Sequence, residues 1–498
     1  MLNKFLSACL LAASAPLQAA TEPNYWPDIA RTDLDFVYQT LKDNHPGALD
    51  KQNPYFKQWM EKGYAAASAS AKGAASVSDV KRVLARYAAG FGDMHLQVGF
   101  NQSANSLNWP GLVMGRSGAR YSVTGRADDW PAALPAIGAT LLSCDGRAPD
   151  TLMNDDVLPA LYNTPGLAAV KNMFMFQFFA DSELAPHRYR SCVFSDAAGN
   201  KEFTLKWQGI SRVAYVKHWD KANPTVPKTS SMTEVAPKTW WIHLPQFNPG
   251  PDEEKELKAL IARTATLRDA ELLIFDTRGN GGGNSQWGAE VLEGLYGAPY
   301  LDHLKAKQAS QGYAEYRVSQ GNLDYNESAL AVLTRQFGAG SSSANNQAGL
   351  VARMRAALAA GTPFLRQTPA APAKLLPAKS PQPLTRARAV LVTDSDCVSS
   401  CLDFADAVRL LPGMKHLGQT TNADTLFMEV RFVDLPSKLG SLVVSQKVYR
   451  NRPRGHNQAL VPHLEFDGHI SDTETLRPWV LQNRHSASNP PQSTGSAE

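Results

Sequence analysis

The sequence predicts an α/β protein built from more than one domain, and three observations support this class. From about residue 213 onward, strand-like segments alternate with helix-like segments, which is typical of βαβ units. Before them, residues 21–100 have a mostly helical pattern, and residues 101–212 consist of short strand-like segments separated by turns. The 498 residues are too many for one hydrophobic core, and 43% apolar with 19% charged residues is the composition of a folded globular protein.

The first 20 residues have the pattern of a secretory signal peptide. Lys4 is followed by an apolar run and then by small residues, and we expect cleavage near Ala19 or Ala20. No later run of about 18 apolar residues occurs, so no integral membrane segment is expected after signal removal. The mature protein is therefore expected to be soluble and either periplasmic or secreted.

Residues 21–100 form the predicted N-terminal helical segment. In DLDFVYQTLKDNHPGALD, the apolar Leu34, Val37 and Leu41 recur at helical spacing, and the pattern stops at HPG. VSDVKRVLARYAAGFGD repeats the helical pattern, and MHLQVGF then alternates like a strand. Residues 101–212 follow as a small β-rich module, with turn signals such as Asp145-Gly146 and a helix expected over MNDDVLPALYN.

Residues 213–484 form the predicted α/β core. Its expected strands are TWWIHLPQF, AELLIFDTRG and ARAVLVTDS, and its expected helices are DEEKELKALIARTATL, SQWGAEVLEGLYG and CLDFADAVRLL. An insertion over about 302–385 interrupts the alternation, and its Pro/Ala/Lys-rich end is expected to be a mobile surface segment. The tail over 485–498 has the composition of a disordered segment.

Charge and cysteine content restrict the partners and cofactors. The formal net charge is +4 and no basic block stands out, so nucleic acid is not an expected partner. In an oxidising compartment, chain order favours disulfides between Cys144 and Cys192 and between Cys397 and Cys401, although three pairings are possible. One C-x3-C spacing without a nearby histidine pair does not indicate zinc, and we expect neither a metal nor another cofactor. The oligomeric state is left open.

The first candidate for chemistry is LLIFDTRGNGGGNSQWGAEVL, a buried strand followed by a glycine cluster and a helix. Its glycines, Gly279 and Gly281 to Gly283, let the backbone turn sharply and point amide hydrogens at an oxyanion or a phosphate. A phosphate loop would have a lysine next to Ser285, but Asn284 occupies that place. An ordinary strand-to-helix turn would use the same glycines, so both interpretations stay open here.

The second candidate is DSDCVSSCLDFADAV, residues 394–408. As a structural feature, Ser400 would cap the helix and Asp403 would reach back to its backbone, leaving a solvent-facing serine without a base. As a functional feature, Ser400 at a strand-to-helix junction would present its hydroxyl at the edge of the sheet. There the amide of Cys401 can stabilise negative charge on a reacting oxygen.

A serine hydroxyl is a weak nucleophile and needs a base within hydrogen-bond reach. The chain has 11 histidines, and His95 differs from the others because GFGDMHLQV places it after a glycine-rich break at the start of a strand. The alternative is a histidine with only a structural role in the core or at the surface.

Three motifs occur in order: Asp93-Met94-His95, FDTRGNGGG and VLVTDSDCVSSCLDFADAV. Together they resemble the C-terminal processing (tail-specific) peptidases and their tricorn relatives, to which HPGAL and IGATLLSCDGRAP are also similar. The resemblance implies a ClpP/crotonase-like βαβ core, a PDZ-like module over residues 101–212 and a peptide or protein substrate.

The resemblance also implies roles for single residues. The family's nucleophile lies three positions before an acidic residue at the helix start, which selects Ser400 over Ser399. The amide of Cys401 and that of Gly281 or Gly282 would then form the oxyanion hole.

The base differs between the branches of this family. Residues 418–430 lack the lysine of the tail-specific branch, so the resemblance favours the tricorn-like branch with His95 as the base. A glutamate orients the histidine in that branch, but RGHNQALVPHLEFDG has Asn457 and Gln458 where the acid is expected. An amide can hold an imidazole while stabilising its charged form less, and Glu465 is another option.

The leading hypothesis is therefore an exported serine endopeptidase that forms an acyl-enzyme on Ser400 with His95 as general base. One alternative is a catalytically weak or inactive protein that binds an apolar ligand or peptide on the same scaffold, favoured by the missing carboxylate near residue 457. Another is an esterase that uses the same Ser-His pair.

Overall fold

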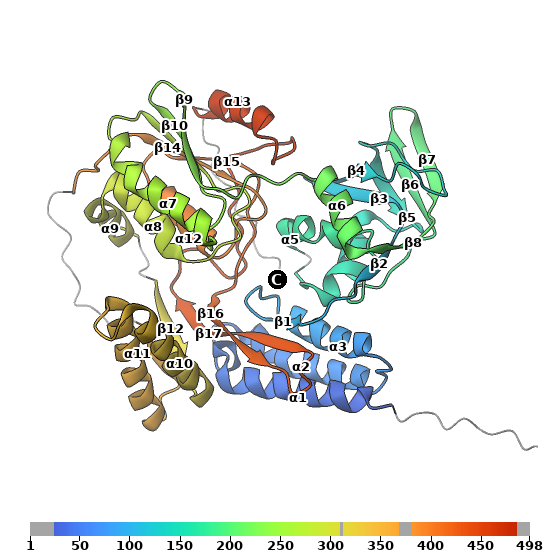
Figure 1. The fold of residues 1–498 in the computed structure, drawn as a ribbon, viewed down its shortest axis with the longest axis horizontal. Helices are drawn as coiled ribbons and strands as arrows, with labels where there is room; N and C mark the ends of the chain where they lie inside the picture. Colours follow the sequence, from blue (N-terminus) through green and yellow to red (C-terminus); the bar gives the residue numbers. More distant parts are fainter. Residues whose placement is uncertain (1–23, 165, 309–311, 368–379, 486–498) are drawn as a thin grey trace, which may run out of the picture.

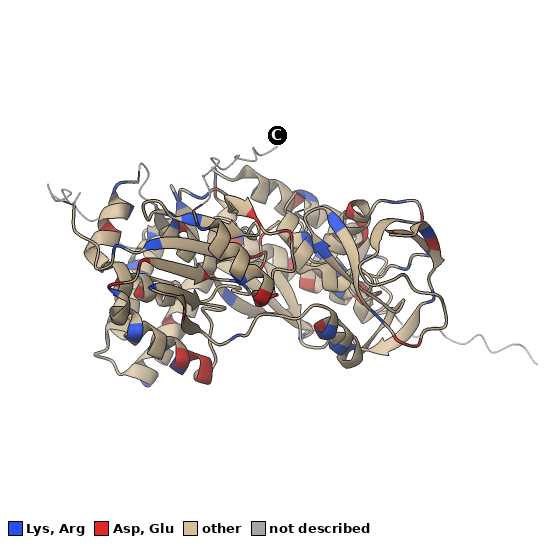
Figure 2. Ribbon diagram, turned by 90° about the horizontal axis from the view of Figure 1, so that it is seen from above, with Lys and Arg blue, Asp and Glu red and all other residues tan. Residues whose placement is uncertain are grey.

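The structure is a computed structural model that describes residues 24–164, 166–308, 312–367 and 380–485. The expected signal peptide and nearly all of the expected tail lie outside these residues. Within them, no helix combines the length and the apolar character needed to cross a membrane. Lys and Arg positions are interspersed with Asp and Glu positions along the ribbon (Figure 2).

The α/β core is a sheet with strand order β18-β15-β14-β11-β10-β9, in which only β9 is antiparallel to its neighbour. The strands are β9 (Ser231–Ala236), β10 (Thr239–His243), β11 (Leu272–Asp276), β14 (Arg388–Thr393), β15 (Lys415–Gly418) and β18 (Leu464–Glu465). The helices are α7 (Pro251–Arg263), η5 (Thr264–Leu267), α8 (Ser285–Tyr296), α9 (Ala298–Ala306), α12 (Ser400–Arg409) and α13 (Thr473–Asn483). The expected βαβ alternation is confirmed.

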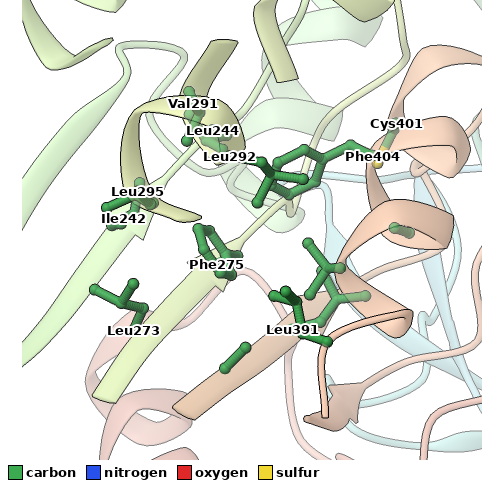
Figure 3. Close-up of a cluster of buried hydrophobic side chains, with 14 of the residues drawn as sticks. Ile242, Leu244, Leu273, Phe275, Val291, Leu292, Leu295, Leu391, Cys401 and Phe404 are labelled. Carbon is green, nitrogen blue, oxygen red and sulfur yellow. The ribbon is translucent and has the colours of Figure 1, made fainter. Parts of the chain in front are cut away.

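Both faces of this sheet are covered, as a parallel sheet requires. Every residue of β11 is buried. On one face, Phe275 and Leu391 pack against Leu292 of α8 and Phe404 of α12 (Figure 3). On the other face, Ile274 shares a cluster with residues of α13. The sheet is therefore a rigid support for the loops at its edge.

The β-rich module has its own core and the antiparallel strand order β3-β4-β5-β6-β7. Its strands are β2 (Ser106–Trp109), β3 (Leu112–Ser117), β4 (Arg120–Arg126), β5 (Thr140–Cys144), β6 (Ser191–Asp196), β7 (Gly199–Thr204) and β8 (Gln208–Ser211). Its helices are α4 (Pro149–Leu152), η2 (Met153–Val157), η3 (Leu158–Ala160), α5 (Ala168–Met173), η4 (Met175–Gln177) and α6 (Arg212–Ala222). The helix expected over MNDDVLPALYN is thus split into short turns. The expected disulfide between Cys144 and Cys192 is confirmed and joins β5 to β6.

The N-terminal helices share one core with strands from the end of the chain. The elements are α1 (Trp26–Asn44), η1 (Pro46–Ala48), α2 (Pro54–Ala71), α3 (Val77–Ala89), β1 (Gln97–Phe100), β16 (Phe427–Asp434) and β17 (Gly440–Arg450). Strand β1 pairs with β17, and the hairpin of β16 and β17 lies over the three helices (Figure 1). Residues 30–98 and residues 427–448 form a single buried cluster. The N-terminal segment expected to end at residue 100 therefore shares its hydrophobic core with strands from the end of the chain.

The described residues of the insertion expected over residues 302–385 consist largely of helices and strands, and most of its Pro/Ala/Lys-rich end lies outside the residues that the structure describes. It contains β12 (Tyr313–Arg317), α10 (Gln320–Phe337), α11 (Ser342–Ala359) and β13 (Phe364–Arg366). Strand β12 pairs with β17 and β13, and the two helices pack on each other around a small cluster that includes Leu350 and Met354. The insertion thereby extends the sheet that contains β1.

Candidate active site

Two loops leave the same edge of the parallel sheet and meet there. Strands β11 and β14 are adjacent and parallel, with Asp276 opposite Val392. The glycine cluster follows β11, and residues 394–399 follow β14. The carboxylate of Asp394 accepts a hydrogen bond from the Gly279 amide at 2.8 Å, which ties the loops together. The carboxyl ends of parallel strands are the usual position of a site in such folds.

Ser399 occupies a strained turn between β14 and α12. Its φ of 57° and ψ of −124° put a non-glycine residue in a region that costs roughly 1–3 kcal/mol. Its carbonyl accepts the amides of Leu402 and Asp403, so the backbone of Ser399 begins the helix while its side chain is left out of the helix cap. A serine on such a strand-to-helix turn presents its hydroxyl at the top of the sheet.

The structure brings Ser399, not Ser400, to the imidazole of His95. The distance from Ser399 Oγ to His95 Nε2 is 3.4 Å, across 304 positions of sequence. Ser400 is the first residue of α12, is 2% exposed, and its hydroxyl has no hydrogen-bond partner. Ser399 precedes the helix with a positive φ, whereas Ser400 is the first helical residue, so the two side chains point in different directions.

The expected capping box is also absent from the start of α12. Asp403 accepts a hydrogen bond from the Ser285 hydroxyl at 2.8 Å instead of reaching back to Ser400. Burial raises the pKa of the Asp403 carboxyl, and the Ser285 hydrogen bond opposes that rise. This contact joins the first turn of α12 to the first turn of α8.

His95 is held in a turn between α3 and β1. Its backbone amide donates to Asp93 Oδ1 at 2.9 Å, and its Nδ1 lies 3.7 Å from the same oxygen. Asp93 is 2% exposed, and burial raises the pKa of its carboxyl while His95 opposes that rise. The carboxylate beside the imidazole therefore comes from the Asp93-Met94-His95 motif itself.

The residues expected to orient His95 contact other groups. Asn457 Nδ2 donates to the carbonyl of Gly92 at 2.9 Å, so it supports the backbone before His95 and not the ring. Gln458 Oε1 accepts the Gly455 amide at 2.7 Å within its own turn. Glu465 is exposed and accepts from Thr420. None of the three side chains reaches the imidazole, because each is satisfied by a nearer partner.

Of the expected oxyanion donors, Gly281 has an amide that is free among the described residues, whereas the amides of Cys401 and Gly282 are already bonded. The amide of Cys401 donates to the Val398 carbonyl at 3.2 Å, and that of Gly282 donates to Asn280 Oδ1 at 3.0 Å. By contrast, the amides of Ser400 and Gly281 have no acceptor among the residues that the structure describes. Free amides beside a nucleophile can stabilise negative charge on a reacting oxygen.

The two neighbouring glycines give a matched pair of variants. A Cβ at Gly282 would lie 2.8 Å from Ser399 Cβ, and its φ is +94°, whereas a Cβ at Gly281 would meet nothing within 4 Å. We expect Gly282→Ala to lower kcat by about 10²-fold or more by displacing Ser399, and Gly281→Ala to stay within about threefold. Steady-state kinetics on one peptide substrate measures both, and equal effects would contradict this packing.

A disulfide between Cys397 and Cys401 brackets Ser399, which confirms the second expected pairing. Both cysteines are fully buried, and the bridge closes a loop with a sequence separation of only 4. Loop closure is worth about 2 kcal/mol here, against about 4 kcal/mol for the separation of 48 between Cys144 and Cys192. The shorter bridge therefore acts mainly on the local backbone.

Removing each disulfide is expected to affect different quantities. Cys144→Ser/Cys192→Ser should lower the thermal midpoint more, because it opens the longer loop. Cys397→Ser/Cys401→Ser should lower kcat more, because the strained backbone of Ser399 loses its constraint. Thermal unfolding and turnover of both double variants provide the comparison, and unchanged turnover of the second would count against a role at Ser399.

A buried ionic cluster around Arg454 was missed from the sequence. Its guanidinium contacts Asp406 at 2.9 Å and Asp403 at 3.4 Å on α12, and also Asp424. Arg452 joins the cluster through Asp424 at 2.8 Å. The cluster fixes α12 against residues 424–454. Arg452 and Arg454 in RNRPRG were the available signal, but no spacing rule identifies partners so distant in sequence.

The strained serine with a histidine opposite it, beside free amides at the edge of a parallel sheet, is the geometry of a hydrolase that uses a serine. Residues 238–466 match the sequence model of peptidase family S41. The chain carries a peptidase family S41 domain. The S41 domain contains both loops with Ser399 and Gly281, whereas His95 lies outside the matched residues. The family consists of serine-type peptidases, so the expected enzyme class is confirmed.

Two solved structures share the fold of this chain at low identity, and a third is less similar. Mature CPAF complexed with lactacystin has a TM-score of 0.60 at 15% identity, covering 92% of this chain and 98% of that chain. Mature CPAF alone has a TM-score of 0.61 at 14% identity, covering 93% and 99%. The photosystem II D1 C-terminal processing protease has a TM-score of 0.35 at 12% identity, covering 88% and 93%. No curated protein sequence matches the chain.

Proposed function

We propose that this protein is an exported serine endopeptidase in which Ser399 is the nucleophile and His95 the general base. The observation that carries the proposal is the 3.4 Å contact between Ser399 Oγ and His95 Nε2, made by a serine with a strained backbone. The role expected for Ser400 thus passes to its neighbour. Such a contact is somewhat long for proton transfer, but catalytic hydrogen bonds often shorten only when substrate is bound.

The chemistry follows from the positions of these groups. His95 Nε2 accepts the Ser399 proton as Oγ attacks the carbonyl carbon of a peptide bond. The amides of Ser400 and Gly281 donate to the oxyanion, and His95 then gives its proton to the leaving amine. Water then attacks the acyl-enzyme while His95 accepts its proton, and His95 returns that proton to Ser399 Oγ as the carboxylic acid product leaves. Asp93 stabilises the imidazolium formed in between, from the position 3.7 Å away that is described above.

The substrate is proposed to be an extended peptide or an unfolded protein. The antiparallel sheet of the β-rich module would help to admit such a chain in the manner of a PDZ-like domain, by pairing with it as an added strand. Two disulfides among the described residues support an oxidising compartment, as does the apolar N-terminal sequence. We therefore propose a periplasmic or secreted enzyme.

A fluorophosphonate probe tests the pairing directly. Wild-type protein should be labelled at Ser399, and His95→Ala should lose the labelling because the hydroxyl is no longer activated. Mass spectrometry of the peptide that contains residues 394–408 measures the modification. Labelling that persists in His95→Ala and disappears in Ser400→Ala would contradict the proposal.

A catalytically weak binding protein is the second candidate, and the geometry at His95 is what favours it. The 3.4 Å and 3.7 Å separations exceed the range of about 2.6–3.2 Å for efficient proton transfer. Probe labelling together with cleavage of an unfolded protein excludes this candidate. Cleavage of small acyl esters without cleavage of peptides would instead identify an esterase with the same Ser-His pair.

A further inference from the structure

At the carboxylate of Asp93, one of its own oxygens and two facing histidine nitrogens are buried without a hydrogen bond to another described residue. They are His45 Nε2, Asp93 Oδ2 and His95 Nδ1. His45 Nε2 lies 3.8 Å from Asp93 Oδ2, and His95 Nδ1 lies 3.7 Å from Asp93 Oδ1. An unpaired buried donor or acceptor is costly. The distances from the two histidine nitrogens to the Asp93 oxygens thus exceed the usual hydrogen-bond length by less than about 1 Å.

The hydrogen of His45 is fixed on the nitrogen that faces Asp93. The amide of Gly47 donates to His45 Nδ1 at 3.0 Å, so Nδ1 carries no proton and the neutral ring carries it on Nε2. The ring is fully buried and is stacked on Phe56 at a centroid distance of 4.1 Å, with the edge of Phe427 at 4.8 Å. Burial also lowers the pKa of His45 well below its usual value, which keeps the ring neutral.

We propose that His45 is a positioning residue of the active site, which donates Nε2–H to Asp93 Oδ2 and thereby keeps that carboxylate ionised and aimed at His95. The proposal rests on the proposed peptidase function of Ser399 and His95. The proposed line of contacts runs from His45, which follows α1, through Asp93 and His95, which precede β1, to Ser399, which precedes α12. A small closing movement on substrate binding would bring all of them within hydrogen-bond distance.

Other groups around Asp93 do not replace this donor. A hydrogen bond from the Thr425 hydroxyl lowers the pKa of Asp93, but this hydroxyl also donates to the Phe427 carbonyl at 3.4 Å, and the charge of Asp424 raises that pKa. Tyr162 is a neutral phenol whose hydroxyl donates to the Gly92 carbonyl at 3.0 Å. His95 itself must give up its charge in the resting enzyme to act as a base. His45 is thus the neutral ring donor that stays available to Asp93 throughout the reaction.

Two substitutions separate the two nitrogens of His45. In His45→Asn the side-chain oxygen can take the place of Nδ1 and accept the Gly47 amide, but no donor reaches the position of Nε2; in His45→Gln the NH2 group can take the place of Nε2, but no acceptor lies at the position of Nδ1. We expect His45→Asn to lower kcat by about 10- to 100-fold, the value of one hydrogen bond to a charged group. KM should be unchanged, because His45 is buried away from any substrate. His45→Gln should retain kcat within about threefold.

The pH profile distinguishes positioning from a merely structural effect. Without the donor the pKa of Asp93 rises, so a larger fraction of the carboxyl is protonated at low pH. The acidic limb of kcat/KM in His45→Asn should therefore move to higher pH by roughly one unit. That limb should stay at its wild-type position in His45→Gln. Circular dichroism and thermal unfolding establish that both variants are folded.

The outcomes separate this inference from the proposed function. If wild type shows turnover that depends on Ser399 while His45→Asn keeps the wild-type kcat and acidic limb, the role of His45 is overturned and the peptidase assignment stands. If wild type shows no turnover that depends on Ser399, both the role of His45 and the peptidase assignment are overturned. If neither variant folds, nitrogen-15 NMR of the histidine rings in wild type decides: an Nε2–H tautomer of His45 from pH 5 to 8 supports the role, and an Nδ1–H tautomer overturns it.

Discussion

Replacing Ser399 by alanine is expected to lower the turnover of an unfolded protein substrate by about 10⁶-fold, the usual cost of losing the nucleophile of a serine hydrolase. The hydroxyl of Ser399 lies against His95 Nε2, and no other hydroxyl among the described residues does so. Thermal unfolding should change little, because the substitution removes one partly exposed oxygen. Initial rates measured at saturating substrate give kcat directly.

Ser400→Ala is the matched control for this substitution. The Ser400 hydroxyl is buried without a partner, so its removal leaves the amide at position 400 in place and costs no hydrogen bond. We expect kcat of Ser400→Ala to stay within about tenfold of wild type. An inactive Ser400→Ala beside an active Ser399→Ala would restore the role that the family motif gives to Ser400.

Replacing Asp93 by asparagine is expected to lower kcat by about 10⁴-fold with little change in KM. The asparagine oxygen can still accept the His95 backbone amide, which Asp93 Oδ1 accepts at 2.9 Å, so the turn should be retained. The negative charge beside the imidazole is lost, however, and the imidazolium formed during the reaction is no longer stabilised. Steady-state kinetics over a range of substrate concentrations separates kcat from KM.

Gln458→Ala controls for the alternative source of the third residue. Gln458 is bound to the Gly455 amide within an exposed turn, so we expect its replacement to change kcat by less than about threefold. A loss comparable to that of Asp93→Asn would indicate that residues 457–458 approach His95 during the reaction. In that case an amide side chain would orient His95 in place of the glutamate of the family, which is the arrangement that the sequence predicts.

The α/β fold could be predicted from the sequence because its periodicities are strong. LLIF in β11 and AVLV in β14 are continuous apolar runs, as expected of strands buried on both faces, and the helices between them have amphipathic spacing. The pairing of β1 with β17 could not be predicted, because nothing local to residues 97–100 identifies a partner more than 300 positions away. The boundary predicted at residue 100 was placed there because the partner strand of residues 97–100 could not be identified from the sequence.

The segments that form the candidate active site could be predicted from the sequence, but the individual serine and carboxylate beside His95 could not. His95, the glycine cluster and residues 397–401 were identified by their motifs, and the structure brings them together. The choice between Ser399 and Ser400 depends on where the helix begins and on one backbone angle, which residue identities do not encode. The carboxylate that lies beside His95, that of Asp93, was not identified from the sequence, although it lies only two positions before His95.

The pairing of β1 with β17 has a consequence for when the enzyme becomes active. His95 is carried by a core that needs residues 427–448 to be complete, while Ser399 is carried by the core of the S41 domain. During synthesis, the core that carries His95 therefore stays incomplete until residues 427–448 have emerged. A molecule truncated before residue 427 should therefore lack the contact between His95 and Ser399, and with it the activity proposed above.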